Sequence, residues 1–122
     1  MKRNRKENIS RAEALDCKPI KNSEVEEVSL DSGETMLIYP VKARPWISAV
    51  SRRLGMEASV VRKKLQLDKM GTSVWELLDG KRTVHQVIEV FSLTHRLHSR
   101  EAEVAVIQFI RELGHRGLVG LA

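Results

Sequence analysis

The sequence predicts an α+β fold, in which a small three-stranded antiparallel sheet is followed by three helices in a winged helix-turn-helix arrangement. Three observations lead to this prediction. Two short apolar runs flank a turn signal at residues 31–34. A segment of alternating character follows at Val61–Leu67. Three amphipathic segments with helix start and stop signals then occupy residues 68–118.

The first two strands are expected to form a hairpin. Asp31 favours the start of a turn, and Gly33 supplies the positive φ that a tight turn needs. Pro40 is expected to stop the second strand, because proline has no N–H for the ladder. The apolar residues on either side of the turn are Val25, Val28, Leu30, Met36, Ile38 and Tyr39.

Residues 40–60 are predicted to be an extra segment before the third strand. Pro45 can open a short helix and Gly55 lies past its end. Trp46, Ile47, Val50 and Leu54 recur there at helical spacing. The third strand then places Val61, Lys63, Leu65 and Leu67 on one side, and Arg62, Lys64 and Gln66 on the other.

Each of the three helices has its own end signals. Asp68 can cap the first helix, which Asp79 and Gly80 end, while Thr83 and Ser99 can cap the second and third. The predicted apolar stripe of the first helix is Met70, Val74, Leu77 and Leu78, with Trp75 at the edge. That of the second helix is Val84, Val87, Ile88 and Phe91. That of the third helix is Ala102, Ala105, Val106, Phe109, Ile110 and Leu113.

Length and charge predict one domain with a basic arm. A chain of 122 residues is long enough for one modest core. Residues 1–21 carry seven basic and three acidic side chains without sustained periodicity, so we expect a flexible arm there and a single domain over residues 22–122. Residues 41–67 hold seven basic groups against one acidic group, so the basic excess lies outside the helical half.

Composition also points to a compartment. A single cysteine, Cys17, cannot form an internal disulfide and suits a reducing environment. The basic N-terminus has no apolar region of the kind that a secretory signal contains. No apolar run approaches the roughly 20 residues of a membrane helix. We therefore expect a cytoplasmic protein that does not enter a membrane.

The third helix has a second apolar face. At 100° per residue, Val104 and Ile107 fall outside the core stripe and lie next to each other, one turn apart. Two interpretations stay open. The helix is buried on two sides, or the second face is an apolar groove that awaits a ligand.

Motif residues at regular spacings run through the helical half. They are Leu67 and Asp68, Gly71, the run Val74, Trp75, Glu76, Leu77, Leu78, Asp79 and Gly80, then Thr83 and Val84, Leu113, Arg116, Gly117 and Leu118. In this order and spacing, over about half of the chain, they resemble the PqqD family. Trp75 and Gly80 match the family motif best, and we interpret both as structural residues.

The resemblance implies a module that recognises the leader of a ribosomally made, enzymatically modified peptide. In such modules the leader adds a strand to the sheet edge, and its apolar side chains enter the cleft between the third strand and the third helix. Mapped by element, these are Val61–Leu67 and residues 102–113. The candidate peptide-binding residues on them are Arg62, Lys64, Leu65, Gln66, Val104, Ile107, Gln108 and Arg111.

The basic side chains of the third strand have two interpretations that do not exclude each other. Arg62 and Lys64 can steer an acidic leader towards the strand, or they can guard an exposed edge against aggregation. The resemblance further implies a partner enzyme, such as a radical SAM protein, and no cofactor. The identity of the peptide, a role in PQQ synthesis and a homodimer stay open.

Two rival functional classes are weaker. A winged-helix protein that binds nucleic acid should carry basic and amide side chains on its recognition helix. The third helix instead carries Arg100 and Arg111 against Glu101, Glu103 and Glu112, although the basic N-terminus could still touch phosphates.

The histidines are His85, His95, His98 and His115, and no carboxylate or cysteine lies at ligand spacing from them. We expect no metal site and no enzyme activity.

Overall fold

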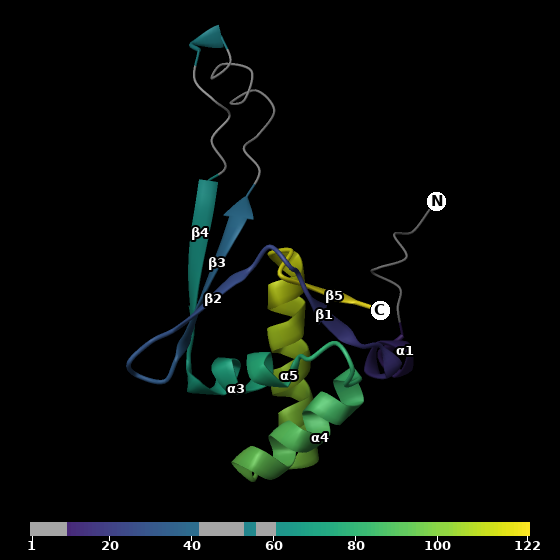
Figure 1. The fold of residues 1–122 in the computed structure, drawn as a ribbon. Helices are drawn as coiled ribbons and strands as arrows, with labels where there is room; N and C mark the ends of the chain where they lie inside the picture. The colour runs from purple at the N-terminus through teal and green to yellow at the C-terminus, as the bar shows by residue number, and fades with distance from the viewer. Residues whose placement is uncertain (1–9, 42–52, 56–60) are drawn as a thin grey trace, which may run out of the picture. The chain divides into compact units, whose positions relative to one another are not determined.

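The computed structural model describes residues 10–41, 53–55 and 61–122 (Figure 1). It is an α+β fold with two small antiparallel sheets and several helices. The chain divides into two compact units, Met1–Asn22 with Met70–Ala122, and Ser23–Lys69. In chain order the elements are α1 (Arg11–Asp16), β1 (Pro19–Lys21), β2 (Glu26–Ser29), β3 (Thr35–Val41), β4 (Val61–Leu67), α3 (Lys69–Leu77), α4 (Val84–His95), α5 (Ser99–His115) and β5 (Val119–Leu121).

The sheet of the unit Ser23–Lys69 has the predicted three strands. They are antiparallel in the order β2-β3-β4, with Glu26 opposite Ile38 and Thr35 opposite Leu67. Every second residue of β3 is buried, as the alternating pattern of a half-buried strand requires: Thr35, Leu37 and Tyr39. Gly33 has a φ of 88° in the turn between β2 and β3, which confirms the predicted hairpin.

Pro40 does not stop the second strand, as the sequence suggested, because β3 continues to Val41. The register explains why the proline is tolerated. Pro40 pairs with Arg62 of β4, whereas β2 pairs with β3 only as far as Ile38. The proline therefore lies beyond the end of β2, where the ladder is no longer two-sided and a missing N–H costs less.

The helix α3 carries the largest core side chain. Trp75 is only 1% exposed, and Val74 and Leu78 are also buried. The prediction that Trp75 lies at the edge of the stripe and Met70 within it is wrong, since Met70 is 40% exposed. Asp68 directly precedes the helix. A wheel drawn over a nine-residue helix has too few turns to fix which residues lie at the centre of its buried face.

The turn after α3 forms as the end signals indicate. Gly80 has a φ of 77°, in the left-handed region that favours glycine. The Asp79 carboxylate accepts hydrogen bonds of 2.9 Å from the backbone N–H groups of Lys81 and Arg82. A carboxylate that accepts from the next residues is the usual way in which aspartate holds a turn.

The helix α4 has the start that the sequence predicts. Thr83 and Gln86 form a capping box, in which each side chain accepts a hydrogen bond from the other residue's backbone N–H. The predicted apolar stripe is the buried stripe, Val84, Val87, Ile88 and Phe91. The helix packs against α5.

The helix α5 differs from the prediction in two details. Its N-cap is His98 rather than Ser99, because the His98 ring accepts a hydrogen bond from the N–H of Arg100. Ala105 was assigned to the core stripe but is exposed, and Phe109 is half-buried. The buried stripe is Ala102, Val106, Ile110 and Leu113, a narrower arc than the sequence indicates.

Three short elements near the two ends of the chain were not predicted. The strands β1 and β5 lie side by side (Figure 1) and pair antiparallel, with Ile20 opposite Gly120. Ser10 caps the six-residue helix α1. The sequence predicts an arm over residues 1–21, and of these only residues 1–9 lie outside the described ranges. Six-residue helices and three-residue strands are too short to show a period.

The segment predicted to hold an extra helix, residues 40–60, lies largely outside the described residues. Within it, residues 53–55 are described, and Gly55 has a φ of 74°.

Candidate functional site

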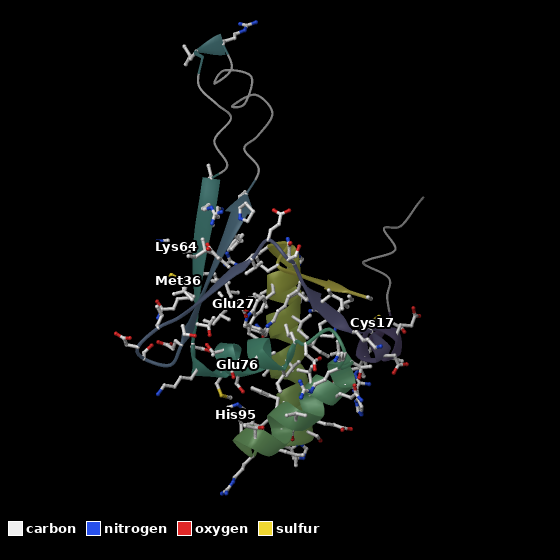
Figure 2. The ribbon with its side chains drawn as sticks, in the orientation of Figure 1. Cys17, Glu27, Met36, Lys64, Glu76 and His95 are labelled. Carbon is white, nitrogen blue, oxygen red and sulfur yellow. The ribbon has the colours of Figure 1, made fainter. Side chains whose placement is uncertain are left out.

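The first candidate surface is the strand β4. Within the described ranges β4 pairs only with β3, so its second edge offers backbone N–H and C=O groups to another strand. Val61, Arg62, Lys63 and Lys64 are exposed, and Leu65 is half-buried. Figure 2 shows the Lys64 side chain on this strand. Three consecutive basic residues thus belong to the strand that forms this open edge.

Two of the predicted site residues on β4 already have partners within the sheet. Arg62 Nη1 donates a 3.0 Å hydrogen bond to Glu26 Oε2, with side chains that are 62% and 65% exposed. Gln66 Nε2 donates to Glu34 Oε1 at 3.3 Å. Exposed contacts of this kind contribute little free energy, so a charged ligand can exchange with them.

The second candidate surface is a groove along α5. It has a volume of about 450 Å³. All four of the predicted site residues on this helix line it: Val104, Ile107, Gln108 and Arg111. The remaining lining residues are Glu103, Glu112 and His115. The residues recur at spacings of three and four, which places them on one face of the helix.

The exposure of this face differs from that of the core stripe. Val104 is 50% exposed and Ile107 is half-buried, while the core stripe on the same helix is buried. Within its own compact unit, the second apolar face is therefore less covered than the core stripe. Its part in binding a ligand stays a prediction.

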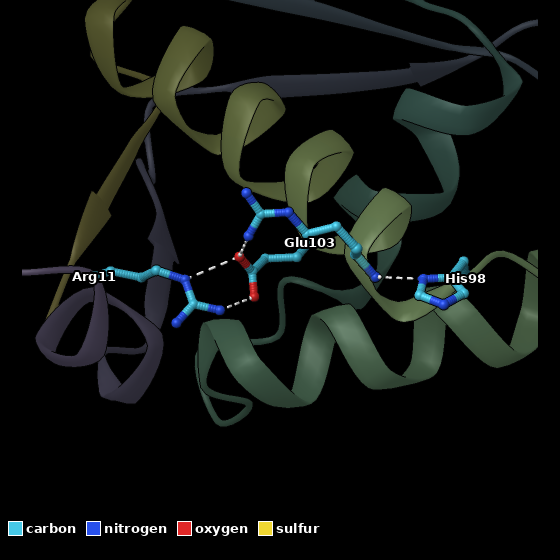
Figure 3. Close-up of polar contacts among 4 residues, drawn as sticks. Arg11, His98 and Glu103 are labelled. Atoms are coloured by element: carbon cyan, nitrogen blue, oxygen red, sulfur yellow. Dashed lines mark hydrogen bonds and ion pairs between the residues drawn. The ribbon is translucent and has the colours of Figure 1, made fainter.

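A charged cluster at Glu103 was not found from the sequence. Arg11 Nε donates a 2.9 Å hydrogen bond to Glu103 Oε2, and Arg11 Nη2 donates to Glu103 Oε1 (Figure 3). The guanidinium therefore binds the carboxylate in a bidentate manner. Arg100 Nη1 lies 3.3 Å from the same Oε2. The hydrogen bond from Arg11 lowers the pKa of Glu103 and raises that of Arg11. The two partners are 92 positions apart, which hides the pair from sequence reasoning.

The Glu103 cluster borders a second cavity of about 560 Å³. Its lining comes from α1, α4 and α5: Arg11, His85, Ile88, Glu89, Ser92, Leu93, Ser99, Arg100 and Glu103. Leu93 is 80% exposed at its rim. His85 Nε2 and Glu89 Oε1, 2.9 Å apart, form an exposed pair on α4.

Two of the histidines line a hollow: His115 lines the α5 groove and His85 lines the cavity beside Glu103. His95, labelled in Figure 2, has its Nε2 2.8 Å from Ser73 Oγ. The centre of the His95 ring lies 4.6 Å from that of Phe91. Cys17 is half-buried. Among the residues that the structure describes, no three or more histidine, cysteine, aspartate or glutamate side chains gather as they would around a metal ion. Over the same residues, no helix combines the length and apolar character needed to cross a membrane.

The sequence matches the family model for Coenzyme PQQ synthesis protein D (PqqD) over residues 47–119, more than half of the chain. The chain belongs to the PqqD family. This range holds β4, α3, α4 and α5, and thus both candidate surfaces.

The fold is shared with a solved structure of low sequence similarity. The structure described as "TbiB1 in Complex with the TbiA(beta) Leader Peptide" superposes with a TM-score of 0.58 and 16% sequence identity. The match covers 82% of this chain and 93% of that chain. The comparison with curated proteins found no match.

Proposed function

We propose that the chain is a non-catalytic module that binds the leader of a ribosomally made precursor peptide and presents it to a modifying enzyme. The observation that carries the proposal is the open edge of β4 in a chain of the PqqD family. The likeness to TbiB1, which was solved with a leader peptide, supports it.

The proposed mode of binding is strand addition. A leader strand along β4 satisfies backbone groups that have no strand partner among the described residues, and this supplies affinity without regard to sequence. Side chains that alternate along the leader supply register and specificity. The apolar groove with Val104 and Ile107 on α5 is the proposed receptor for large apolar side chains. In the same proposal, the sheet and α3–α5 form a winged helix-turn-helix.

The proposed leader is acidic. Arg62, Lys63 and Lys64 set a positive potential along β4, which increases the rate of encounter with an anionic peptide and orients it. A radical SAM protein as the modifying enzyme and a cytoplasmic location belong to the same proposal. They follow from the family resemblance and from the single cysteine.

The test compares glutamate substitutions at two apolar surface residues. Ile107→Glu should leave the fold intact and abolish binding of the leader peptide, because the complex would bury an unpaired carboxylate. Leu93→Glu is the matched control, since Leu93 is 80% exposed and lies on the other cavity. Calorimetry measures binding, and circular dichroism checks the fold.

A charge reversal completes the experiment. Arg62→Glu should weaken an acidic leader more modestly than Ile107→Glu, and the loss should shrink as salt is added. Equal binding by Ile107→Glu and the parent would refute the groove as the receptor. If Ile107→Glu does not fold, Val104→Glu, at a residue that is 50% exposed, takes its place.

A generic DNA duplex is the control ligand. A larger loss of duplex binding in Arg62→Glu than in Ile107→Glu would favour nucleic acid instead.

A further inference from the structure

Glu103 lines two hollows of the unit Met1–Asn22 with Met70–Ala122, which we call the helical unit. It lines the hollow bounded by α1, α4 and α5, and it also lines the groove of Val104 and Ile107 on α5. Its side chain is only 16% exposed. The charge of this carboxylate therefore acts directly on whatever enters the groove.

The groove has an acidic excess unless Glu103 is neutralised. Among its lining residues, Glu103 and Glu112 are acidic and Arg111 is basic. Arg11 donates hydrogen bonds to the Glu103 carboxylate from Nε and Nη2, and Arg100 Nη1 donates a third. With Glu103 paired to these arginines, Arg111 and Glu112 balance each other, and the groove lining loses its acidic excess.

Arg11 reaches Glu103 because of where α1 is held. Ser10 caps α1, and α1 packs on α4. The backbone of Cys17 accepts a hydrogen bond of 2.8 Å from Val84 N–H at the start of α4. These contacts fix the start of the described chain beside α4 and α5, and they bring the guanidinium to the carboxylate.

We propose that Arg11 is a specificity-determining residue of the peptide site, because it neutralises Glu103 and so lets an acidic leader lie along the α5 groove. This inference rests on the proposed peptide-binding function. It gives α1 a role beyond packing: it supplies the cation that sets the charge of the groove. The probe is an acidic peptide selected from a displayed random library on the full chain, with binding that Ile107→Glu abolishes. Its partner probe has every Asp and Glu replaced by Asn and Gln.

Arg11→Gln should weaken the acidic probe roughly threefold at low salt, the scale of one exposed charge pair. It should leave the amide probe unchanged. Arg11→Lys keeps the charge and should restore most of the affinity. Glu103→Gln should tighten the acidic probe, and adding Arg11→Gln to it should cost less than in the parent. Lys81→Gln is the matched control, since it removes one positive charge from a residue that lines neither cavity.

Different results separate this inference from the function on which it rests. Failure to select any peptide that Ile107→Glu abolishes would overturn both. Selective peptide binding that Arg11→Gln leaves unchanged would overturn the inference alone. An equal loss for the acidic and amide probes would also overturn it, because Arg11 would then act only by holding α1 in place.

Discussion

At the scale of single residues, Trp75 anchors the helical unit. Among the described residues it is the largest fully buried side chain, and the Lys21 ammonium lies 4.5 Å from the centre of its ring. A cation over an indole face adds a favourable electrostatic contact to the burial. The single tryptophan of α3 is therefore held by packing and by a residue from β1.

We predict that Trp75→Ala lowers the free energy of unfolding by about 3–5 kcal/mol, because it leaves a cavity in the core. Chemical denaturation followed by circular dichroism measures the change. Trp75→Phe, which keeps an aromatic ring, should cost less. A Trp75→Ala variant with the denaturation midpoint of the parent would contradict the assignment of Trp75 to the core.

The sequence predicts some single-residue roles and cannot predict others. Trp75 and Gly80 were interpreted as structural, which burial and a φ of 77° confirm. Both roles depend on local properties, namely side-chain size and backbone freedom. The contact of Arg11 with Glu103 depends instead on the packing of α1 on α4, and its partners are 92 positions apart, so no local sequence pattern predicts it.

At the scale of elements, the turn between α3 and α4 is held by one carboxylate. Asp79 accepts two backbone hydrogen bonds and lies 3.2 Å from Arg82 Nη1. The backbone hydrogen bonds from Arg82 and Lys81 lower the pKa of Asp79 below its usual value of 3.8. A carboxylate whose pKa is lower in the folded chain stabilises the fold above the unfolded pKa.

We predict that Asp79→Asn is less stable than the parent at neutral pH. The difference should persist down to a pH of about 3.8 and then fall away as acid protonates Asp79 in the folded parent. Thermal unfolding of both proteins across this range checks the prediction. A stability difference that stays constant below that pH would show that the carboxylate charge does not hold the turn.

Strong local signals explain which elements the sequence predicts. The three strands β2, β3 and β4 and the helices α3, α4 and α5 show clear periods or caps, and all six are present. The strands β1 and β5 have three residues each and form only by pairing with each other across the chain. The positions of the candidate residues on β4 and α5 could be predicted because both elements have a clear period, whereas their role in binding stays a prediction.

At the scale of the whole molecule, the two candidate surfaces belong to different compact units. The strand β4 lies in the unit Ser23–Lys69, and α5 lies in the other. Each unit presents a surface with its own chemistry: a basic open edge on β4 and an apolar groove on α5. Sequence patterns predict each surface separately, because alternation and helical spacing are local. The opposed partners on the sheet, Glu26 and Glu34, follow only from the register of the strands.

The central claim is that a leader peptide binds along β4 and in the α5 groove. Titration of the isotope-labelled full chain with a leader peptide tests it most directly, by backbone amide shifts. We predict that the shifts cluster in Val61–Leu67 and around Val104, Ile107 and Gln108, and that exchange of the β4 amides slows as a strand is added. Shifts confined to α1 and the rest of residues 10–21, with β4 and α5 unchanged, would contradict the account.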